Sequence, residues 1–354
     1  MNKIIDILKE KKSIPLDQFI NIALYDKKFG YYMKKNPFGK EGDFITSPMV
    51  SNLFSEMIAL WCISFWEKIK KPKKILIVEL GPGNGSLCKD LLNTFKKFDN
   101  FYNSLEIKLL EISEKLKIIQ KTKINNKKVK WIKKIESIDH GPVIFLVNEF
   151  FDSLPIKQIF RKKNLFFEKY VCLSNNKGKV KFLYKKANKN LINRIKKLNI
   201  ISQGNIIEYP IEAIKYLSII SKKINKFNGA LLTFDYGYTA KTNSDTLQSV
   251  KKHRYTNFLN KPGNTDITSH INFKLFNEVL KKNGLEVKET INQSEFLKKM
   301  GIIERANILS KKMTFKEKAN MFFRLKKLLD YREMGNLFKV LFAKKKNVKF
   351  SLGF

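Results

Sequence analysis

The chain has 354 residues and a formal net charge of +38, because 70 Lys and Arg side chains accompany only 32 Asp and Glu. Hydrophobic residues make up 43% of the total, which is enough for a sizeable core, and the length favours one main domain with appended elements. No apolar run approaches the roughly 18 residues that a membrane-spanning helix needs, so we expect no membrane insertion.

The N-terminal part is expected to be helical. Ser13 to Asp17 has the pattern of a helix start, and Ser51 to Ile69 carries apolar residues at helical spacing. Between these segments, Gly30 to Ser47 is broken by Gly, Pro and Tyr and is too polar for a core. We interpret it as a lid or acceptor-binding loop, and an ordinary connecting loop is the alternative.

A strand followed by a glycine turn is the most informative pattern in the chain. Ile75 to Val78 are four apolar residues in a row, which predicts a buried parallel strand. Glycines then occupy alternate positions and would let bare backbone approach a ligand, at Gly81, Gly83 and Gly85. Nucleotide-like cofactors bind at such strand ends. A tight strand-to-helix turn without a ligand is the structural alternative.

The residues around the glycines favour S-adenosylmethionine over a dinucleotide. Ser86 occupies the position of the third glycine in the dehydrogenase fingerprint. Glu79 lies two residues before the first glycine, where a negative charge can meet a cationic ligand, and S-adenosylmethionine carries a sulfonium and an ammonium. The next predicted strand begins at Leu105 and finishes on Glu111, which could hold ribose hydroxyls, and residues 98–104 resemble a loop. Glu111 could equally be a solvated residue that opens the following helix.

A third apolar strand, Val143 to Val147, ends in a turn that contains two carboxylates, Glu149 and Asp152. Amino-group methyltransferases often carry Asn or Asp followed by Pro-Pro and an aromatic residue here, but this chain lacks the proline pair. A guanidinium is planar, charged and matched by carboxylates, so the pair favours an arginine acceptor whose developing charge it would stabilise. Alternatively, Asp152 caps a helix and Glu149 pairs with a surface lysine.

The order of elements predicts an α/β fold with a Rossmann-like sheet, a helical N-terminal segment, an inserted β-hairpin and a helical C-terminal tail. The hairpin is predicted from Phe166 to Leu173 and from Lys179 to Tyr184, around a turn at Asn175 to Gly178. Later core elements are expected at 211–224, 230–234, 273–282 and 285–287, and a helical segment at 298–341. We therefore divide the chain into parts at 1–70, 71–155, 156–205, 206–297 and 298–354.

Motifs in order over almost the whole chain carry a resemblance to a known family. They are Gly30-Tyr31-Tyr32, Pro37-Phe38-Gly39, Gly42 to Pro48, Glu79 to Gly85, Asn148 to Pro155, Gly229 to Leu232, Asp235-Tyr236-Gly237, Asp245 to Gln248, Asp266 to His270 and Met334 to Lys339. With these motifs the chain resembles the MidA-like family of class I methyltransferases, which includes a mitochondrial complex I assembly factor. The resemblance implies S-adenosylmethionine as cofactor, a protein arginine as acceptor, symmetric dimethylation, and a respiratory complex I subunit as the best-known kind of substrate.

The candidate site residues follow from the patterns and the resemblance together. Expected cofactor-binding residues are Gly42, Asp43, Glu79, Gly81, Gly83, Gly85, Glu111 and Asn148, and expected catalytic residues are Glu149, Asp152 and His270. His270 could accept a proton or orient the acceptor, although a histidine in a polar turn is more often structural. Asp43 could simply hold its turn. The family commonly has an acid and a glutamine where this chain has Met49 and Asn52, which leaves their part in the acceptor site open.

The basic charge and the cysteines point to no special partner. Lysine is spread along the whole chain and accompanies abundant Asn, Ile and Phe, whose codons are rich in A and T. Genome bias therefore explains the charge better than binding to nucleic acid does.

Cys62, Cys88 and Cys172 follow no paired or metal-ligand spacing, which indicates a reduced compartment and no metal site. Residues 1–12 contain acids and lack the arginines of a transit peptide, so we expect a cytoplasmic protein.

Three other classes stay open at this point. A dehydrogenase is one, and the misplaced third glycine argues against it. A nucleic-acid methyltransferase is another, and its binding would weaken steeply with salt. The third, which we rank highest of the three, is a non-catalytic assembly chaperone that keeps the fold. Our preferred mechanism is a direct in-line methyl transfer that needs no covalent enzyme intermediate.

Overall fold

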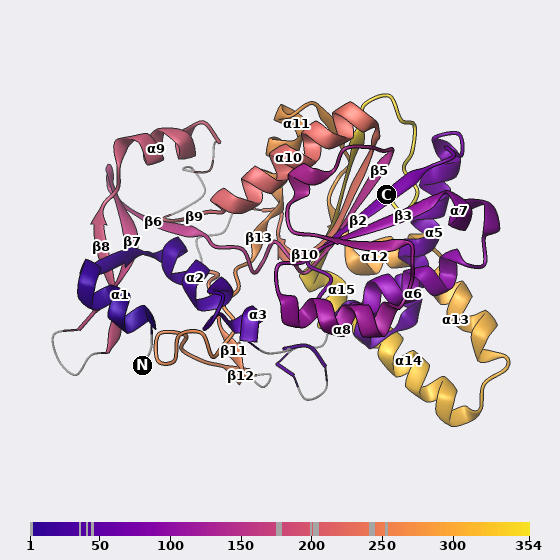
Figure 1. The fold of residues 1–354 in the computed structure, drawn as a ribbon, viewed down its shortest axis with the longest axis horizontal. Coiled ribbons are helices and arrows are strands. Elements are labelled where there is room, and N and C mark those ends of the chain that lie inside the picture. Colours follow the sequence, from indigo (N-terminus) through magenta and orange to yellow (C-terminus); the bar gives the residue numbers. More distant parts are fainter. Residues whose placement is uncertain are drawn as a thin grey trace.

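The computed structural model describes residues 3–34, 37–39, 42–43, 46–174, 179–198, 200, 205–240, 245–251 and 254–354. A large sheet carries helices on both faces, and a smaller sheet lies beside it, next to the N-terminal helices (Figure 1). Within the described residues, no helix has the length and apolar character that a bilayer crossing requires. The turn predicted at Asn175 to Gly178 lies outside the described residues, as do parts of the predicted lid.

The large sheet confirms the predicted Rossmann-like architecture. Its described strands are β2 Ile75–Leu80, β3 Leu105–Leu110, β4 Val129–Ile132, β5 Val143–Asn148, β10 Gly229–Tyr238, β13 Ile271–Asn272, β14 Leu285–Val287, β15 Ile291–Asn292 and β16 Phe338–Lys345. The main path runs β14-β16-β10-β5-β2-β3-β4, with β13 beside β10 and β15 beside β16. Strands β10 to β4 are parallel along this path, whereas β16 is antiparallel to both of its neighbours. The parallel strands therefore bring their carboxyl ends to one edge.

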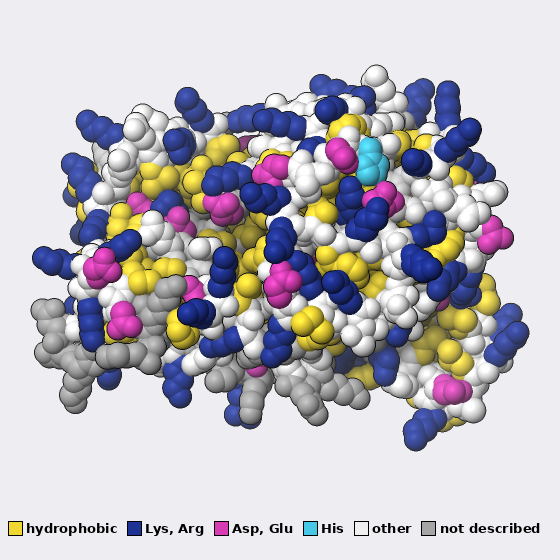
Figure 2. Space-filling view, in the orientation of Figure 1, with side chains coloured by type: hydrophobic (Ala, Val, Ile, Leu, Met, Phe, Trp, Pro, Cys, Tyr) yellow, Lys and Arg dark blue, Asp and Glu magenta, His cyan; other side chains and the backbone are white. Residues whose placement is uncertain are grey.

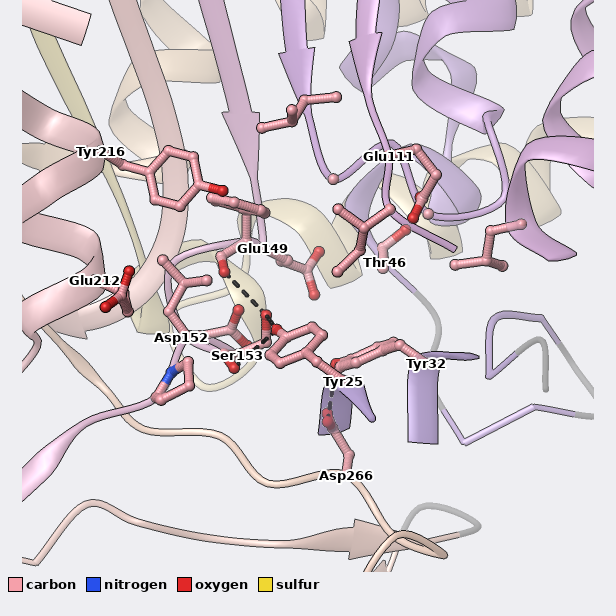
Figure 3. A pocket seen from close by; sticks show the side chains of 18 of the residues that line it. Tyr25, Tyr32, Thr46, Glu111, Glu149, Asp152, Ser153, Glu212, Tyr216 and Asp266 are labelled. Carbon is pink, nitrogen blue, oxygen red and sulfur yellow. Dashed lines mark hydrogen bonds between the residues drawn. The ribbon is translucent and has the colours of Figure 1, made fainter. Parts of the chain in front are cut away.

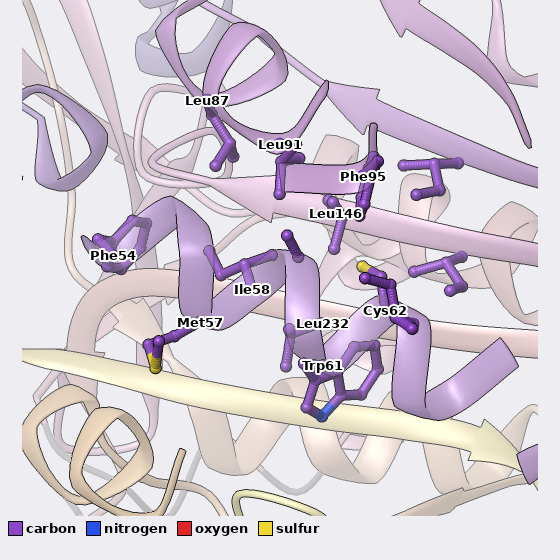
Figure 4. Packing of buried hydrophobic residues seen from close by; sticks show 14 of the residues in the cluster. Phe54, Met57, Ile58, Trp61, Cys62, Leu87, Leu91, Phe95, Leu146 and Leu232 are labelled. Carbon is purple, nitrogen blue, oxygen red and sulfur yellow. The ribbon is translucent and has the colours of Figure 1, made fainter. Parts of the chain in front are cut away.

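Alternation of side chains along the strands builds a core on each face of the sheet. In β2, Ile77 belongs to one core and Val78 to the other. The first core is covered by α5 Asn52–Lys68 and α6 Ser86–Phe95, and the second by α10 Ile211–Phe227 and α11 Phe273–Lys282. Figure 4 shows the first core, where Trp61 and its neighbours on α5 pack against α6 and the strands. Because both faces are covered, the strands are almost wholly apolar.

The smaller sheet holds the inserted segment and joins it to the N-terminus. Its described strands are β1 Ser13–Pro15, β6 Lys157–Lys162, β7 Leu165–Leu173, β8 Val180–Lys186 and β9 Ile206–Tyr209, in the order β1-β7-β6-β9 with β8 paired to β7. The predicted hairpin is confirmed as the antiparallel pair of β7 and β8. A third core packs this sheet against α1 Lys3–Lys11 and α2 Leu16–Tyr25. The helix start predicted at Ser13 is therefore a short strand followed by a helix.

Other elements connect these layers. They are α3 Tyr31–Lys34, α4 Ser47–Val50, α7 Asp99–Ser104, α8 Glu114–Ile124, η1 Ile135–Ser137, α9 Lys189–Lys196, β11 Val250–Lys251, β12 Arg254–Tyr255, α12 Gln293–Lys299, α13 Ile302–Ser310, α14 Phe315–Leu329 and α15 Met334–Leu337. The helices α13 and α14 extend from the lower right of the molecule in Figure 1.

Some predicted elements are wrong, each for a physical reason. The tail predicted as helical up to residue 341 becomes strand β16 at Phe338, since a strand buried on both faces has the same continuous apolar run as a buried helix. Strand β4 was absent from the predicted order because it has only four residues, and the loop predicted at 98–104 contains helix α7. The predicted polar loop at 30–47 contains α3, whose Tyr31 is fully buried.

The basic side chains are scattered over the surface. Lys and Arg residues cover the face shown in Figure 2 and do not gather over a single element there. A nucleic-acid footprint is usually a concentrated stripe or patch. This face therefore gives no support to a nucleic-acid site, in line with the explanation of the charge by composition.

Candidate active site

A cavity of about 270 Å³ lies at the carboxyl ends of β2, β3 and β5 (Figure 3). Strand ends of a parallel sheet meet at one edge, so segments far apart in the sequence contribute to it. The lining includes Tyr25, Tyr32, Gly81, Gly83, Glu111, Glu149, Asp152, Glu212, Tyr216, Tyr236 and Asp266. These include five carboxyl groups, and none of the described residues lining the cavity is a Lys or an Arg. On a chain of net charge +38, this cavity is suited to cationic ligands.

The glycine turn after β2 forms one wall of the cavity. Gly81, Gly83 and Gly85 all have positive φ, at 63°, 55° and 79°. Residues other than glycine rarely adopt such values. A Cβ on Gly81 would lie 2.6 Å from Cδ2 of Phe150, and one on Gly83 would lie 3.3 Å from Cζ of Phe38. The turn thus needs glycine both for its backbone conformation and for space.

Glu79 lies beside the glycine turn in a smaller adjoining cavity, which Asn148 also lines. Glu79 is only 3% exposed, its Oε2 has no hydrogen-bond partner among the described residues, and burial raises its pKa to about 8. The Oδ1 atom of Asn148 is likewise buried without a partner. Two unsatisfied acceptors in one small cavity are costly unless a donor occupies it. The ammonium of S-adenosylmethionine is a cationic donor of the kind that fits them.

Glu111 directly follows β3 and lines the larger cavity. Its Oε1 accepts a hydrogen bond from the Ser113 N–H at 2.7 Å, and its Oε2 accepts one from the Gln120 side chain at 2.9 Å. Gln120 also donates to the carbonyl of Gly83 at 2.8 Å. Burial raises the pKa of Glu111. Gln120 therefore ties Glu111, in the wall of this cavity, to the glycine turn.

Glu149 follows β5 in a strained conformation, with φ at 50°. Its backbone N–H donates to the Phe234 carbonyl at 2.9 Å, which anchors the turn to β10. Its Oε1 accepts hydrogen bonds from the Ser47 N–H at 3.3 Å and from the Asn148 side chain at 3.2 Å. Burial and the nearby Asp152 raise its pKa to about 8. A non-glycine residue in this backbone region is uncommon, and such strain is often associated with function.

Asp152 is buried a few residues later in the same turn. Its Oδ2 accepts a hydrogen bond from the Tyr236 hydroxyl, whereas its Oδ1 has no partner among the described residues. Burial raises the pKa of Asp152 to about 6. Behind it, the fully buried Asp235 accepts hydrogen bonds from the N–H groups of Phe151 and Asp152, at 3.1 and 3.3 Å. Asp235 thus holds the turn that presents both candidate catalytic acids to the cavity.

The sequence analysis missed an aromatic and acidic wall opposite these acids. Tyr25 and Tyr32 stack with ring centroids 5.7 Å apart, and the Tyr32 hydroxyl donates to Asp266 at 2.8 Å (Figure 3). Burial raises the pKa of Asp266 to about 7. Tyr216 faces the same cavity from α10. The only signal in the sequence was the presence of Tyr32 and Asp266 within the family motifs, because no local pattern links residues more than 200 positions apart.

Gly85, although it belongs to the glycine turn, lines neither of the two cavities, and three further expected site residues also lie outside both. His270 is half-buried behind Tyr236, with ring centroids 5.4 Å apart, and burial lowers its pKa. Asp43 is buried and accepts a hydrogen bond from the Tyr31 hydroxyl. At Gly42 a Cβ would lie 2.2 Å from the Pro37 carbonyl oxygen, so glycine is required there for close backbone packing. The geometry of all three fits a structural role.

Met49 and Asn52 stand where the family commonly has an acid and a glutamine. Met49 lies near the smaller cavity, and Asn52 lies outside both cavities. The sulfur of Met49 is 3.6 Å from the amide nitrogen of Asn84, a residue that lines the smaller cavity. Asn52 is exposed at the start of α5 and lines neither of the two cavities. Of the two, only Met49 is close enough to influence a ligand.

Comparisons with known proteins agree with this geometry. A family model of S-adenosyl-L-methionine-dependent methyltransferases matches residues 57–291. The chain is similar to the mitochondrial protein arginine methyltransferase NDUFAF7 of Danio rerio, with 30% identity over 353 residues, 92% of this chain and 82% of that protein. It is 29% identical to the Xenopus tropicalis protein of the same name over 341 residues, 88% and 77% of the two chains. A COG1565 superfamily protein from Burkholderia thailandensis, crystallised with S-adenosyl-homocysteine, has a TM-score of 0.83 at 21% identity, covering 98% and 92%.

The sheet order, the glycine turn and the anionic cavity define the class of protein: this is the class I methyltransferase fold, and the molecule is a methyltransferase. The family model spans more than half of the chain, and the 30% identical relative aligns with 92% of it. The chain belongs to the MidA-like family of S-adenosylmethionine-dependent methyltransferases, as its motifs predicted. Its cofactor is S-adenosylmethionine, which supplies an electrophilic methyl group on a sulfonium when bound.

We expect Glu79→Gln to stabilise the cofactor-free protein at pH 8. The folded-state pKa of Glu79 is about 8 and its ordinary value is 4.5, so the folded chain holds a proton that the unfolded chain releases. The free energy of unfolding therefore falls as the pH rises between these values. Glutamine does not ionise, so the variant does not lose this stability. The expected rise in Tm is about 2–5 °C at pH 8 and close to zero at pH 4.5.

Thermal unfolding at the two pH values checks this prediction, with the exposed Glu10→Gln on α1 as the matched control. The same substitution at Glu79 should weaken S-adenosylmethionine binding about tenfold or more, because it removes a charge facing the ammonium. An equal Tm change in both variants, or unaltered cofactor affinity, would contradict the assigned role of Glu79.

Proposed function

We propose that this protein is an arginine N-methyltransferase that acts on protein substrates. The observation that carries the proposal is the absence of Lys and Arg from the described lining of a cavity with five carboxyl groups, next to the S-adenosylmethionine site. A guanidinium is a planar cation with a fork of N–H donors, and carboxylates are its preferred partners. The stacked rings of Tyr25 and Tyr32 add a surface on which a planar cation can lie.

Within this proposal, Glu149 and Asp152 form an electrostatic clamp on the guanidinium. Each has an oxygen without a hydrogen-bond partner among the described residues, Oε2 of Glu149 and Oδ1 of Asp152. One guanidinium nitrogen attacks the methyl group in line, so that the N–C bond forms as the methyl–sulfur bond breaks, and it gives up one N–H proton, which an ionised carboxylate of the pair can accept. Charge builds on the other two nitrogens meanwhile, and the fixed carboxylates stabilise that redistribution. Positioning supplies most of the remaining rate, so no covalent intermediate with the enzyme is needed.

The names of the relatives support the choice of acceptor. The NDUFAF7 proteins of several vertebrates are named as protein arginine methyltransferases, and the chain aligns with most of their length. We propose symmetric dimethylation as the product and a respiratory complex I subunit, or a protein like it, as the substrate, on the strength of the family resemblance. The acceptor must carry its arginine on a segment narrow enough to reach a cavity of about 270 Å³.

Incubating the purified chain with methyl-labelled S-adenosylmethionine and a lysate of its own organism, then mapping the label by mass spectrometry, tests this function. The expected result is label on one arginine, or a few, of a single protein. Label on RNA, with transfer that falls steeply as salt rises, would indicate a nucleic-acid methyltransferase instead. Cofactor binding without any transfer, together with stable capture of one protein, would indicate an assembly chaperone.

Activity should rise with pH through the range in which the clamp ionises. The pKa values of Asp152, Asp266 and Glu149 are raised to about 6, 7 and 8, so these groups are largely protonated below pH 6 and ionised above pH 8. A cationic acceptor binds only the ionised clamp, so kcat/KM should increase about tenfold or more between pH 6 and pH 8. Initial rates at subsaturating acceptor check this, and a flat profile would argue against the clamp.

A further inference from the structure

A chain of buried hydrogen bonds connects helix α14 with the carboxylate of Glu149. The side-chain Nε2 of Gln293 donates to the Leu328 carbonyl of α14 at 3.1 Å. The Ser47 hydroxyl donates to Oε1 of Gln293 at 3.2 Å, and the Ser47 N–H donates to Oε1 of Glu149 at 3.3 Å. Ser47, Glu149 and Gln293 are therefore brought together although each is more than 100 residues from the other two, and Leu328 joins them 35 residues beyond Gln293.

The two middle members of this chain are completely buried. Ser47 and Gln293 have no exposed surface, and neither lines the described cavities. Gln293 is the first residue of α12 and uses both ends of its amide, one toward α14 and one toward Ser47. A buried amide is costly unless both ends are satisfied, so this arrangement specifies one position of α4 relative to α12.

We propose that Gln293 and Ser47 are positioning residues that hold Glu149 in the orientation needed to clamp the acceptor. Gln293 fixes the Ser47 hydroxyl, and the Ser47 backbone N–H in turn holds Oε1 of Glu149, which leaves Oε2 for the acceptor. Neither residue lines the cavity in which the acceptor would lie. The expected change in methylation kinetics rests on the proposed arginine methylation. The hydrogen-bond link from Gln293 through Ser47 to Glu149 does not.

The surroundings of Glu149 show why a fixed donor matters. Burial disfavours the ionisation of Glu149, and the nearby carboxyl of Asp152 acts in the same direction. The hydrogen bonds from Ser47 and from Asn148 oppose these effects and lower its pKa. Loss of the Ser47 donor should therefore make Glu149 harder to ionise and free its side chain to turn away from the cavity.

Gln293→Met tests the proposal, because methionine keeps the length of the side chain and removes both hydrogen bonds. We expect kcat with the acceptor found by labelling to fall about tenfold, the KM for S-adenosylmethionine to stay within twofold, and the rise of kcat/KM to move to higher pH. Ser47→Ala should have a similar effect, and the double variant should be no worse than the more impaired single variant, because both act through one hydrogen-bond chain.

Asn277→Ala is the matched control, since Asn277 lies on another helix, α11, lines neither cavity, and hydrogen-bonds through its side chain to Thr290 in the segment before β15. It should lower stability without moving the pH profile. An independent measurement uses no acceptor: hydrogen exchange at the Ser47 amide should accelerate in Gln293→Met with S-adenosylhomocysteine present, and remain unchanged in Asn277→Ala.

The two readouts separate the possible failures. Unchanged exchange at Ser47, or additive losses in the double variant, would overturn the positioning role. Accelerated exchange in Gln293→Met, together with a wild-type chain that methylates no arginine, would retain the structural link and overturn the arginine methylation. A pH profile in Gln293→Met that matches wild type, with active protein confirmed by cofactor titration, would also overturn the proposal.

Discussion

Glu149→Gln should abolish most turnover while leaving S-adenosylmethionine affinity within about twofold. The substitution removes a carboxylate that faces the cavity through Oε2 but keeps the side-chain oxygen that accepts hydrogen bonds from Ser47 and Asn148. A fixed charge that stabilises the transition state contributes more to kcat than to ground-state binding. The expected loss in kcat is therefore about 100-fold to 1,000-fold, in the range measured for removal of one preorganised electrostatic group.

Two measurements check this prediction. Isothermal titration calorimetry gives the affinity for S-adenosylmethionine, and a methylation assay with the labelled acceptor gives kcat. Asp152→Asn should give a loss of similar size, because the Tyr236 hydroxyl can still donate to the remaining side-chain oxygen. Glu10→Gln should change neither quantity. Loss of cofactor binding in Glu149→Gln would reverse the assignment and place Glu149 in the cofactor site.

Gly83→Val should lose S-adenosylmethionine binding by about 100-fold or more. Valine is poorly tolerated at φ 55°, and its Cβ would lie 3.3 Å from the ring of Phe38, within the wall that the cofactor approaches. A β-branched side chain in the left-handed region is a genuine outlier, so the turn must also rearrange. Both effects remove the bare backbone surface on which cofactor binding depends.

Gly301→Val is the control for backbone strain alone. Gly301 precedes α13 and has φ 83°, and a Cβ there would lie 3.6 Å from a Glu304 carboxylate oxygen, an ordinary van der Waals contact. This variant should lose stability to a similar extent and keep cofactor affinity in calorimetry. Equal losses of affinity in the two variants would show that strain, and not the approach of the ligand, explains Gly83.

Local patterns predicted the parts of the site that lie on consecutive residues. The strand and glycine turn from Ile75 to Gly85 and the strand that ends at Glu111 were confirmed as β2, its turn and β3. Continuous apolar runs and alternate glycines are local features, because each depends on the backbone of a few neighbouring residues. The resemblance to the family then identified the cofactor, which no single motif could do.

Other features could not be predicted because they depend on contacts between distant segments. His270 resembles a catalytic residue in the sequence but packs behind Tyr236, and only the relative placement of β10 and β13 decides this. The apolar run of β16 suits a helix as well as a strand. It forms a strand because β10 and β14 pair with it. Asp266 enters the cavity because the segment that carries it meets Tyr32.

The amino-acid sequence by itself determined the class of fold, the cofactor turn and the pair of acids after β5, since these follow from short-range periodicity and backbone requirements. Only the tertiary structure decided which carboxyl groups share one cavity, which of them are unsatisfied, and how Gln293 reaches Glu149. Burial, pKa and hydrogen-bond partners are properties of packed surfaces, and packing joins residues whose separation in sequence carries no local signal.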